Sequence, residues 1–187
     1  MDLWFPQRYF SRMKTAAIFC SASYTINPKY NEIARQVVRL LCENGVRIVS
    51  GGTVKGTMGV VADEASKYNL GNIGILPRFM ADVAHPNLSQ LIWTESMSQR
   101  KDALVDIGKD YAIALPGGIG TMDELFSTFT LAKVKKYFGK VIAYNYNGFY
   151  DKLKDLLDFY VETEMLDKES RGLIYFPKNL EELSELL

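Results

Sequence analysis

The sequence predicts an α/β protein with a Rossmann-like, doubly wound three-layer sandwich, in which a mostly parallel sheet lies between two layers of helices. Short apolar runs alternate with helical patterns along the chain, and most of these runs are continuously apolar. Continuous apolar runs are typical of parallel strands that are covered on both faces. Strands separated by helices are joined by right-handed crossovers, which wind the chain on both sides of one sheet.

Seven runs are predicted as strands, and six segments as helices. The first helix has clear ends, because Asn27 suits the N-cap, Pro28 the first helical position, and Gly45 the residue after the end. The predicted strands cover residues 16–20, 47–50, 73–76, 91–93, 111–115, 141–144 and 173–176. The later helices are predicted at residues 58–69, 96–108, 122–137, 149–165 and 180–187.

The length and composition indicate one domain. A chain of 187 residues with 48% hydrophobic content suffices for one substantial core and is short for two. Residues 14–187 are predicted to form this single nucleotide-binding domain, and residues 1–13 a poorly ordered N-terminal extension. Its first dozen residues are too short and too interrupted by charge and proline for a signal peptide or a membrane span.

Charge and cysteine usage exclude several classes of function. Lys plus Arg number 22, and Asp plus Glu also number 22. The chain therefore lacks the excess of basic residues that is typical of a nucleic-acid-binding protein. The cysteines Cys20 and Cys42 favour buried, reduced thiols and a cytoplasmic protein. The one histidine, His85, lacks neighbours at ligand spacing, so it is interpreted as a solvated loop residue and no metal site is expected. Asp63 and Glu64 are interpreted as an ordinary exposed helix face.

Two glycine-rich turns, residues 50–59 (SGGTVKGTMG) and 116–124 (PGGIGTMDE), carry the functional information. Each follows a predicted strand and precedes a predicted helix, so backbone N–H groups face the carboxyl edge of the sheet, where α/β proteins hold phosphates. The first turn lacks the Lys of a P-loop after Gly56, and Asp123 replaces the third glycine of a dinucleotide fingerprint. We therefore do not expect the protein to bind NAD. Taken alone, either turn could also be an ordinary βα loop without a ligand.

Together with residues 96–101 (SMSQRK), these turns resemble the Lonely guy (LOG) family. Its members are cytokinin riboside 5′-monophosphate phosphoribohydrolases, often mislabelled as lysine decarboxylases. The resemblance extends from about residue 16 to the end of the chain. Two motifs differ: residues 97–101 are MSQRK where the family has MHERK, and residues 53–57 are TVKGT where members commonly have GSVGL.

The resemblance implies hydrolysis of the N-glycosidic bond of N6-substituted adenosine monophosphates, with Arg100 and Glu124 as the catalytic pair. The oxocarbenium-like transition state needs a fixed anion near the ribose. Glu124 lies in the first turn of a predicted helix, where the helix dipole is expected to favour its ionised form. Arg100 is permanently charged, so it suits steering phosphate, orienting Glu124 or stabilising the leaving base.

The same resemblance implies a substrate-binding set. The N–H groups of Gly117, Gly118, Gly120 and Thr121 are expected to hold the phosphate, with the Thr121 hydroxyl as a further donor. The remaining expected contacts are Gly51, Gly52, Thr53, Met97 and Lys101. The expected partner is a small nucleoside monophosphate, without cofactor or metal, and the expected assembly is a homodimer.

Two other functions remain open from the sequence. The phosphate cradle could serve a non-catalytic nucleotide-binding or sensing protein, a hypothesis that the altered residues Ser98 and Gln99 keep alive. A decarboxylase would need pyridoxal phosphate on a lysine, and this small chain has no identifiable lysine for that role.

Overall fold

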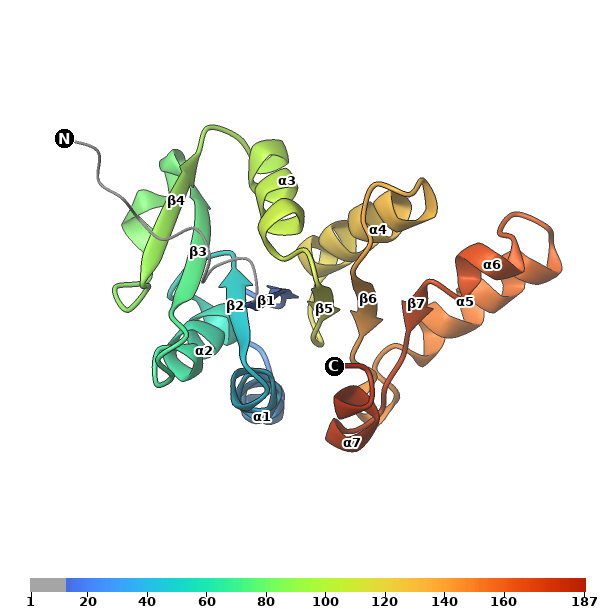
Figure 1. The fold of residues 1–187 in the computed structure, drawn as a ribbon, viewed down its shortest axis with the longest axis horizontal. Coiled ribbons are helices and arrows are strands. Elements are labelled where there is room, and N and C mark those ends of the chain that lie inside the picture. The colour runs from blue at the N-terminus through green and yellow to red at the C-terminus, as the bar shows by residue number, and fades with distance from the viewer. Residues whose placement is uncertain (1–12) are drawn as a thin grey trace.

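A computed structural model describes residues 13–187. The predicted extension therefore lies outside the described residues, except for Met13. The described chain forms a seven-stranded, all-parallel sheet with the strand order β4-β3-β2-β1-β5-β6-β7 (Figure 1). This order winds outward from β1 in both directions and confirms the predicted doubly wound class. The strands are β1 (Lys14–Phe19), β2 (Val46–Ser50), β3 (Asn72–Pro77), β4 (Gln90–Thr94), β5 (Tyr111–Ala114), β6 (Lys140–Ala143) and β7 (Ile174–Tyr175).

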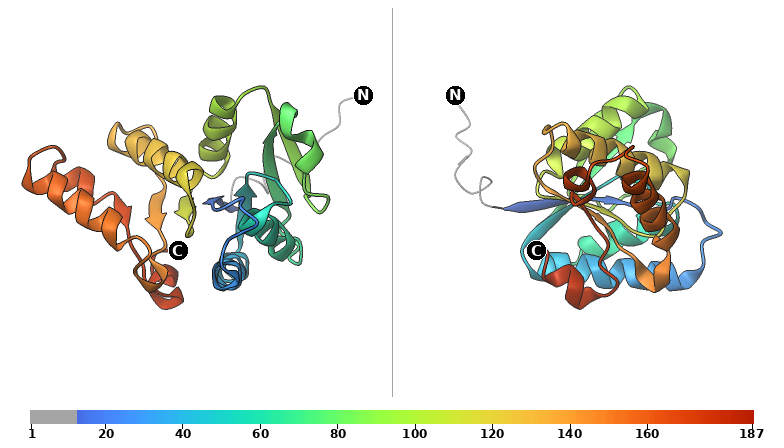
Figure 2. Two further views of the ribbon diagram at one scale, coloured as in Figure 1. Left: turned by 180° about the vertical axis from the view of Figure 1, so that it is seen from behind. Right: turned by 90° about the vertical axis from the view of Figure 1, so that its right-hand side faces the viewer.

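Helices lie on both faces of the sheet (Figure 2), and a hydrophobic cluster packs between the sheet and the helices on each face. One cluster packs α1, α2 and α7 against one face, and the other packs α3, α4 and α5 against the opposite face. In β1, Ala16 and Ile18 join the first cluster, whereas Ala17 and Phe19 join the second. A strand covered on both faces needs apolar residues at every position, which explains the continuous apolar runs. The helices are α1 (Pro28–Glu43), α2 (Gly56–Ala65), α3 (Met97–Ile107), α4 (Ile119–Lys133), α5 (Asp151–Glu162), α6 (Lys168–Arg171) and α7 (Leu180–Ser184).

The ends of α1 confirm the prediction. The Asn27 side chain accepts a hydrogen bond from the Lys29 N–H at 3.0 Å, Pro28 begins the helix, and Gly45 has a φ of 73°. Other helix ends differ by a few residues. α4 ends before the predicted Tyr137 because Lys135 adopts a φ of 58°, which helical backbone does not allow. The 3-10 segments η2 (Arg78–Val83) and η3 (Tyr146–Gly148) were not predicted, since short turns without a buried face lack an apolar period.

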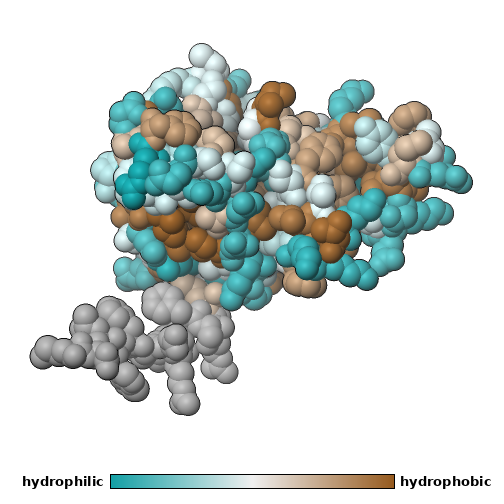
Figure 3. Space-filling model, turned by 90° about the horizontal axis from the view of Figure 1, so that it is seen from above, coloured by the Kyte–Doolittle hydropathy of each residue, from teal (hydrophilic) through white to brown (hydrophobic). Residues whose placement is uncertain are grey.

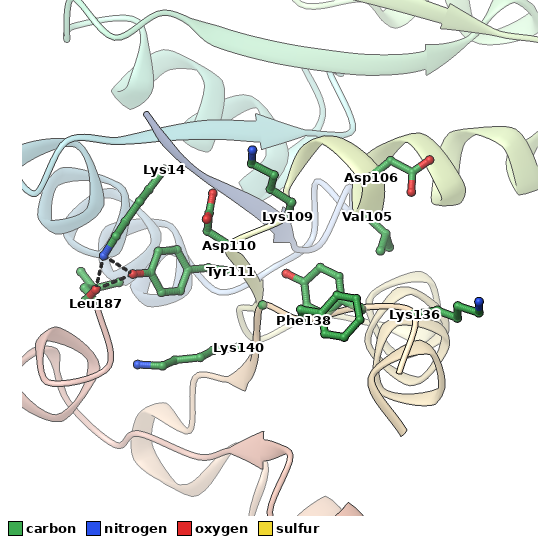
Figure 4. A pocket seen from close by; sticks show the side chains of 12 residues that line it. Lys14, Val105, Asp106, Lys109, Asp110, Tyr111, Lys136, Phe138, Lys140 and Leu187 are labelled. Carbon is green, nitrogen blue, oxygen red and sulfur yellow. Dashed lines mark hydrogen bonds between the residues drawn. The ribbon is translucent and has the colours of Figure 1, made fainter. Parts of the chain in front are cut away.

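The amino ends of the strands form the edge opposite to the glycine turns. Here Lys14 Nζ donates to the Tyr111 hydroxyl at 2.9 Å and to the Leu187 carbonyl at 2.6 Å, so β1 and β5 are tied to the segment after α7 (Figure 4). These residues line a cavity of about 700 Å³, which Lys109 and Lys136 also line. Within the described residues, no helix is long and apolar enough to cross a membrane.

Candidate active site

The candidate site lies where the winding direction of the sheet reverses. β1 and β5 are neighbours, but β1 continues into α1 on one face and β5 into α4 on the other. The loops at their carboxyl ends diverge, and open α/β sheets bind ligands in the crevice that this divergence leaves. A cavity of about 260 Å³ is found there, lined by Cys20, Ser21, Ala22, Ser23, Thr53, Met58, Met80, Met97, Arg100, Gly118, Gly120, Thr121 and Glu124.

The N-terminus of α4 opens into this cavity through two glycines. Gly118 is the N-cap residue, and no side chain caps the helix. A Cβ added at Gly118 or Gly120 would meet no atom within 4 Å, and neither residue has a positive φ. Neither backbone conformation nor packing among the described residues therefore requires glycine at these positions. The bare backbone instead leaves the first N–H groups of a long helix accessible, which is the arrangement that binds anions.

Thr121 completes this helix end with an unpartnered donor. Its side chain is 2% exposed, and its Oγ1 has no hydrogen-bond partner among the described residues. A buried hydroxyl without a partner is costly, so it points to a group that supplies the missing contact. Gly117 is explained by this side chain, because a Cβ there would lie 2.1 Å from Thr121 Oγ1. Gly117 itself lines a smaller neighbouring cavity of about 200 Å³, together with Tyr30 and Phe149.

Arg100, on α3, is held by three elements at once. Its Nε donates to the Ile75 carbonyl at 3.1 Å, its Nη1 to Glu124 Oε1 at 3.0 Å, and its Nη2 lies 3.9 Å from Met58 Sδ. Arg100 is 6% exposed. A guanidinium with this many fixed contacts is a rigid cation, whose charge is oriented before any ligand arrives.

Glu124 lies just beyond the first turn of α4, and it lines the cavity next to Arg100. Burial raises the pKa of its carboxyl to about 7, although the positive charge of Arg100 acts in the opposite direction. The nearby charge of Asp123 raises this pKa further. The expectation that the helix terminus would keep Glu124 readily ionised is therefore wrong. α4 begins at Ile119, so Glu124 lies beyond its first turn, and the loss of water around the carboxyl raises its pKa.

The first glycine turn supports the site more than it lines it. Thr53 is a cavity residue, but Gly51 and Gly52 are not. A Cβ on Gly51 would lie 1.8 Å from Arg100 Nη2, so glycine at this position makes room for the guanidinium. Gly52 has a φ of 71°, and a Cβ there would lie 3.0 Å from Gly74 Cα. These glycines position Arg100 and Thr53, while direct contact with a substrate stays a prediction for them.

Met97 lines the cavity and is 47% exposed, but Lys101 does not line it. Lys101 Nζ pairs with Asp123 Oδ1 at 2.9 Å on the outer side of α3 and α4. The altered motif has a structural explanation at Gln99. Its side chain accepts from the Glu95 N–H, while Ser96 Oγ accepts from the Gln99 N–H. This arrangement resembles a capping box at the start of α3, except that Gln99 contacts the residue before the N-cap.

Several site residues were missed by the sequence interpretation. Ser21 and Ser23 follow β1, and the rule that ligands bind at the carboxyl ends of strands could have found them. Met80 comes from η2, for which the sequence carries no pattern. Cys20 also lines the cavity; it is a free, buried thiol, as predicted, and burial raises its pKa.

His85 and Glu64 contradict their predicted exposure. His85 is only 6% exposed and lies beside the first glycine turn, where its backbone N–H donates a hydrogen bond to the Gly52 carbonyl. Glu64 is 2% exposed and pairs with Arg39 and Lys67. Asp63, in contrast, is 61% exposed, as predicted. The burial of a single polar residue cannot be predicted from hydrophobic periodicity, because His and Glu also occur on solvent-exposed helix faces and loops.

The fold and the site define a class: a Rossmann-like α/β protein in which an uncapped helix N-terminus lies beside a buried Arg–Glu pair. The family described as "Possible lysine decarboxylase" matches residues 58–187. The chain therefore belongs to this family, which includes the LOG proteins. The family's description names a lysine decarboxylase as a possible activity, whereas the relatives with curated names are phosphoribohydrolases.

Relatives with a named activity cover most of the chain. The cytokinin riboside 5′-monophosphate phosphoribohydrolase LOG2 of Arabidopsis thaliana is 29% identical, covering 95% of this chain and 84% of the relative. The cytokinin riboside 5′-monophosphate phosphoribohydrolase of Mycobacterium tuberculosis is 30% identical, with 80% of each chain covered.

Solved structures resemble the fold. The molybdenum cofactor binding protein of Rippkaea orientalis matches with a TM-score of 0.70 and 22% identity, over 94% of this chain and 95% of that chain. The molybdenum cofactor carrier protein of Chlamydomonas reinhardtii matches with a TM-score of 0.69 and 16% identity, over 93% and 95%. At these identities the likeness shows the fold alone.

The raised pKa of Glu124 predicts a specific dependence of stability on pH. Between about pH 4.5 and 7 the unfolded chain has released a proton that folded Glu124 still holds, so the free energy of unfolding falls as the pH rises. The total loss is on the order of 3 kcal/mol, complete above pH 7. Urea denaturation from pH 4.5 to 8 should show this loss in the wild type and not in Glu124→Gln. Parallel curves for the two proteins would contradict the raised pKa.

Proposed function

We propose that the protein hydrolyses the N-glycosidic bond of nucleoside 5′-monophosphates, with N6-substituted adenosine monophosphates as the substrate class. The C1′–N bond breaks, and water supplies a hydroxyl to C1′ and a proton to the base, which leaves ribose 5-phosphate and free base. The observation that carries the proposal is the buried pair of Arg100 and Glu124, 3.0 Å apart, directly beside the open end of α4. The activity named for the relatives supports it.

The phosphate is assigned to the N-terminus of α4. The N–H groups of Gly118, Gly120 and Thr121 and the unpartnered Thr121 hydroxyl offer donors to the phosphate oxygens. Because Thr121 and Glu124 are three residues apart on one helix, a nucleotide anchored at the first can present its ribose to the second. The methionines Met58, Met80 and Met97 offer apolar, polarizable surface to the base.

Glu124 and Arg100 take different roles in this proposal. Ionised Glu124 stabilises the positive charge that develops on the ribose and accepts the proton of the attacking water. With a pKa of about 7, the carboxylate is basic enough for this task near neutral pH. Arg100 cannot give up its proton, so it orients Glu124 and stabilises negative charge on the departing base.

We propose that the protein acts as a homodimer in the cytoplasm. Two free, buried thiols fit a reducing compartment. Exposed apolar side chains on α4 and on the segment from α5 to α6 support self-association, and Figure 3, seen from the side of α3 and α4, shows hydrophobic surface there between hydrophilic groups. They include Ile119, Phe126, Phe159, Tyr160 and Met165, of which Ile119 is 87% exposed.

The dimer is expected to elute as one species of about twice the 21.2 kDa chain mass in size-exclusion chromatography with light scattering. Phe126→Ser combined with Met165→Ser should shift it toward the monomer, because both changes reduce the apolar area that a second copy would bury. The exposed Phe79, on η2, serves as a matched control when replaced by Ser. A wild-type mass equal to one chain would contradict the homodimer.

The hydrolase is tested by chromatography of the base and ribose 5-phosphate after incubation with AMP and with N6-isopentenyl-AMP. We expect both products from at least one nucleotide, in equal amounts. Glu124→Gln should lower the rate by about 10²- to 10⁴-fold, because it removes the basic oxygen with little change of shape. If the nucleotides bind but stay intact, the protein is the non-catalytic nucleotide-binding or sensing protein instead.

A glycine-to-alanine pair tests the phosphate site separately from stability. In Gly120→Ala the new methyl meets no protein atom within 4 Å, so the melting temperature should not fall. The methyl would occupy space next to the helix N–H groups, so the Kd for AMP should rise about tenfold or more, measured by calorimetry. The same change at Gly172, after α6, is the control and should leave the Kd unchanged. Unchanged AMP affinity in Gly120→Ala would contradict this phosphate position.

A further inference from the structure

His85 connects the segment after η2 with the first glycine turn and with α2. Its imidazole Nε2 lies 3.2 Å from Asp63 Oδ1 on α2, and its Nδ1 accepts the Asn87 N–H at 3.2 Å. Its own backbone N–H donates to the Gly52 carbonyl at 2.9 Å. Because Nδ1 accepts a hydrogen bond, the imidazole proton is assigned to Nε2, and this N–H donates a hydrogen bond to the Asp63 carboxylate. His85 thus connects its segment to the glycine turn through its backbone and to α2 through its side chain.

The neighbouring backbone strengthens the same connection. The Val54 N–H donates to the Val83 carbonyl at 3.0 Å, and Thr53 and Ala84 form an isolated antiparallel bridge. The first glycine turn is therefore attached edge to edge to the segment that begins with η2. His85 lies at the end of this attachment, and its contact with Asp63 is the one that fixes it to a helix.

Both attached segments reach the candidate site. Thr53 and Met80 line the main cavity, one from each segment. Gly51 packs against the Arg100 guanidinium so closely that no Cβ fits between them. A displacement of the turn would therefore move a cavity wall and loosen the contact that holds the cation of the Arg–Glu pair.

We propose that His85 is a positioning residue of the active site, which, with Asp63, fixes residues 51–53 against Arg100 and the nucleotide. The inference rests on the proposed function, since it needs a nucleotide in the cavity. His85 touches no reacting atom in this assignment. Its effect passes through Gly52, so it is expected in nucleotide affinity and KM more than in kcat.

The structure also separates positioning from general stabilisation. His85 is buried, but Asp63 is 61% exposed, so water can partly replace its carboxylate and the loss of this hydrogen bond should lower stability only modestly. Removing its carboxylate should therefore leave the fold intact while it frees the imidazole from α2. Small displacements of groups that contact a substrate can cost far more than this in activity, up to about 10²-fold for a shift of 1 Å.

The test compares Asp63→Ala, Asp63→Asn and His85→Ala with a control, Asp155→Ala, an exposed carboxylate on α5. The measurements are the Kd for AMP, kcat and KM for AMP and N6-isopentenyl-AMP, and the melting temperature. We expect Asp63→Ala to raise the Kd and KM about threefold or more and His85→Ala about tenfold, with smaller changes in kcat. Asp63→Asn keeps an acceptor oxygen for Nε2 and should stay near the wild type, as should the control.

Two outcomes would overturn the proposal. If the wild type binds or hydrolyses the nucleotide and the Asp63 and His85 variants lose only melting temperature, His85 has a structural role alone, and the proposed function stands. If the wild type neither binds nor hydrolyses either nucleotide, the proposed function fails, and the positioning role fails with it.

Discussion

The buried ion pair of Arg100 and Glu124 is the interaction around which the candidate site is organised. Removing two charged groups from water is costly, and the cost is offset only where geometry and further hydrogen bonds are good. Here the guanidinium has the Glu124 carboxylate at 3.0 Å and the Ile75 carbonyl at 3.1 Å, and Gly51 leaves the space it needs. These requirements fix α3, α4, β3 and the first glycine turn relative to one another.

The strand order makes this meeting possible. Since β5 lies next to β1, the helices α3 and α4 cover the same face of the sheet and bring Arg100 and Glu124 within hydrogen-bond distance from positions 24 residues apart. The loop after β1 lines the same cavity with Ser21 and Ser23. The site is thus a consequence of the reversal in winding direction. Of the residues that differ from the family motifs, Ser98 and Gln99 lie outside the cavity, whereas Thr53 lines it.

Much of this arrangement could be predicted from sequence because it depends on local patterns. All seven strands were found from apolar runs, and α1 from its capping residues, since burial on both faces and unsatisfied helix ends act on neighbouring residues. The position of Lys101 outside the cavity, the burial of His85 and the raised pKa of Glu124 could not be predicted in the same way. Each depends on groups distant in sequence, namely Asp123 for Lys101, Gly52 and Asp63 for His85, and the surrounding protein that removes water from Glu124.

In the proposed function, the position of Glu124 would couple nucleotide binding to the protonation of its carboxyl. A phosphate held at the N-terminus of α4 would bring negative charge to within one helical turn of a carboxyl whose pKa is already about 7. A nearby anion disfavours ionisation, so binding alone would hold Glu124 more strongly in its protonated form. The fixed charge of Arg100 acts against this effect and lowers the same pKa. A protein that only binds phosphate gains nothing from a buried carboxylate beside it; a hydrolase does, because the opposing cation keeps that carboxylate available as a base.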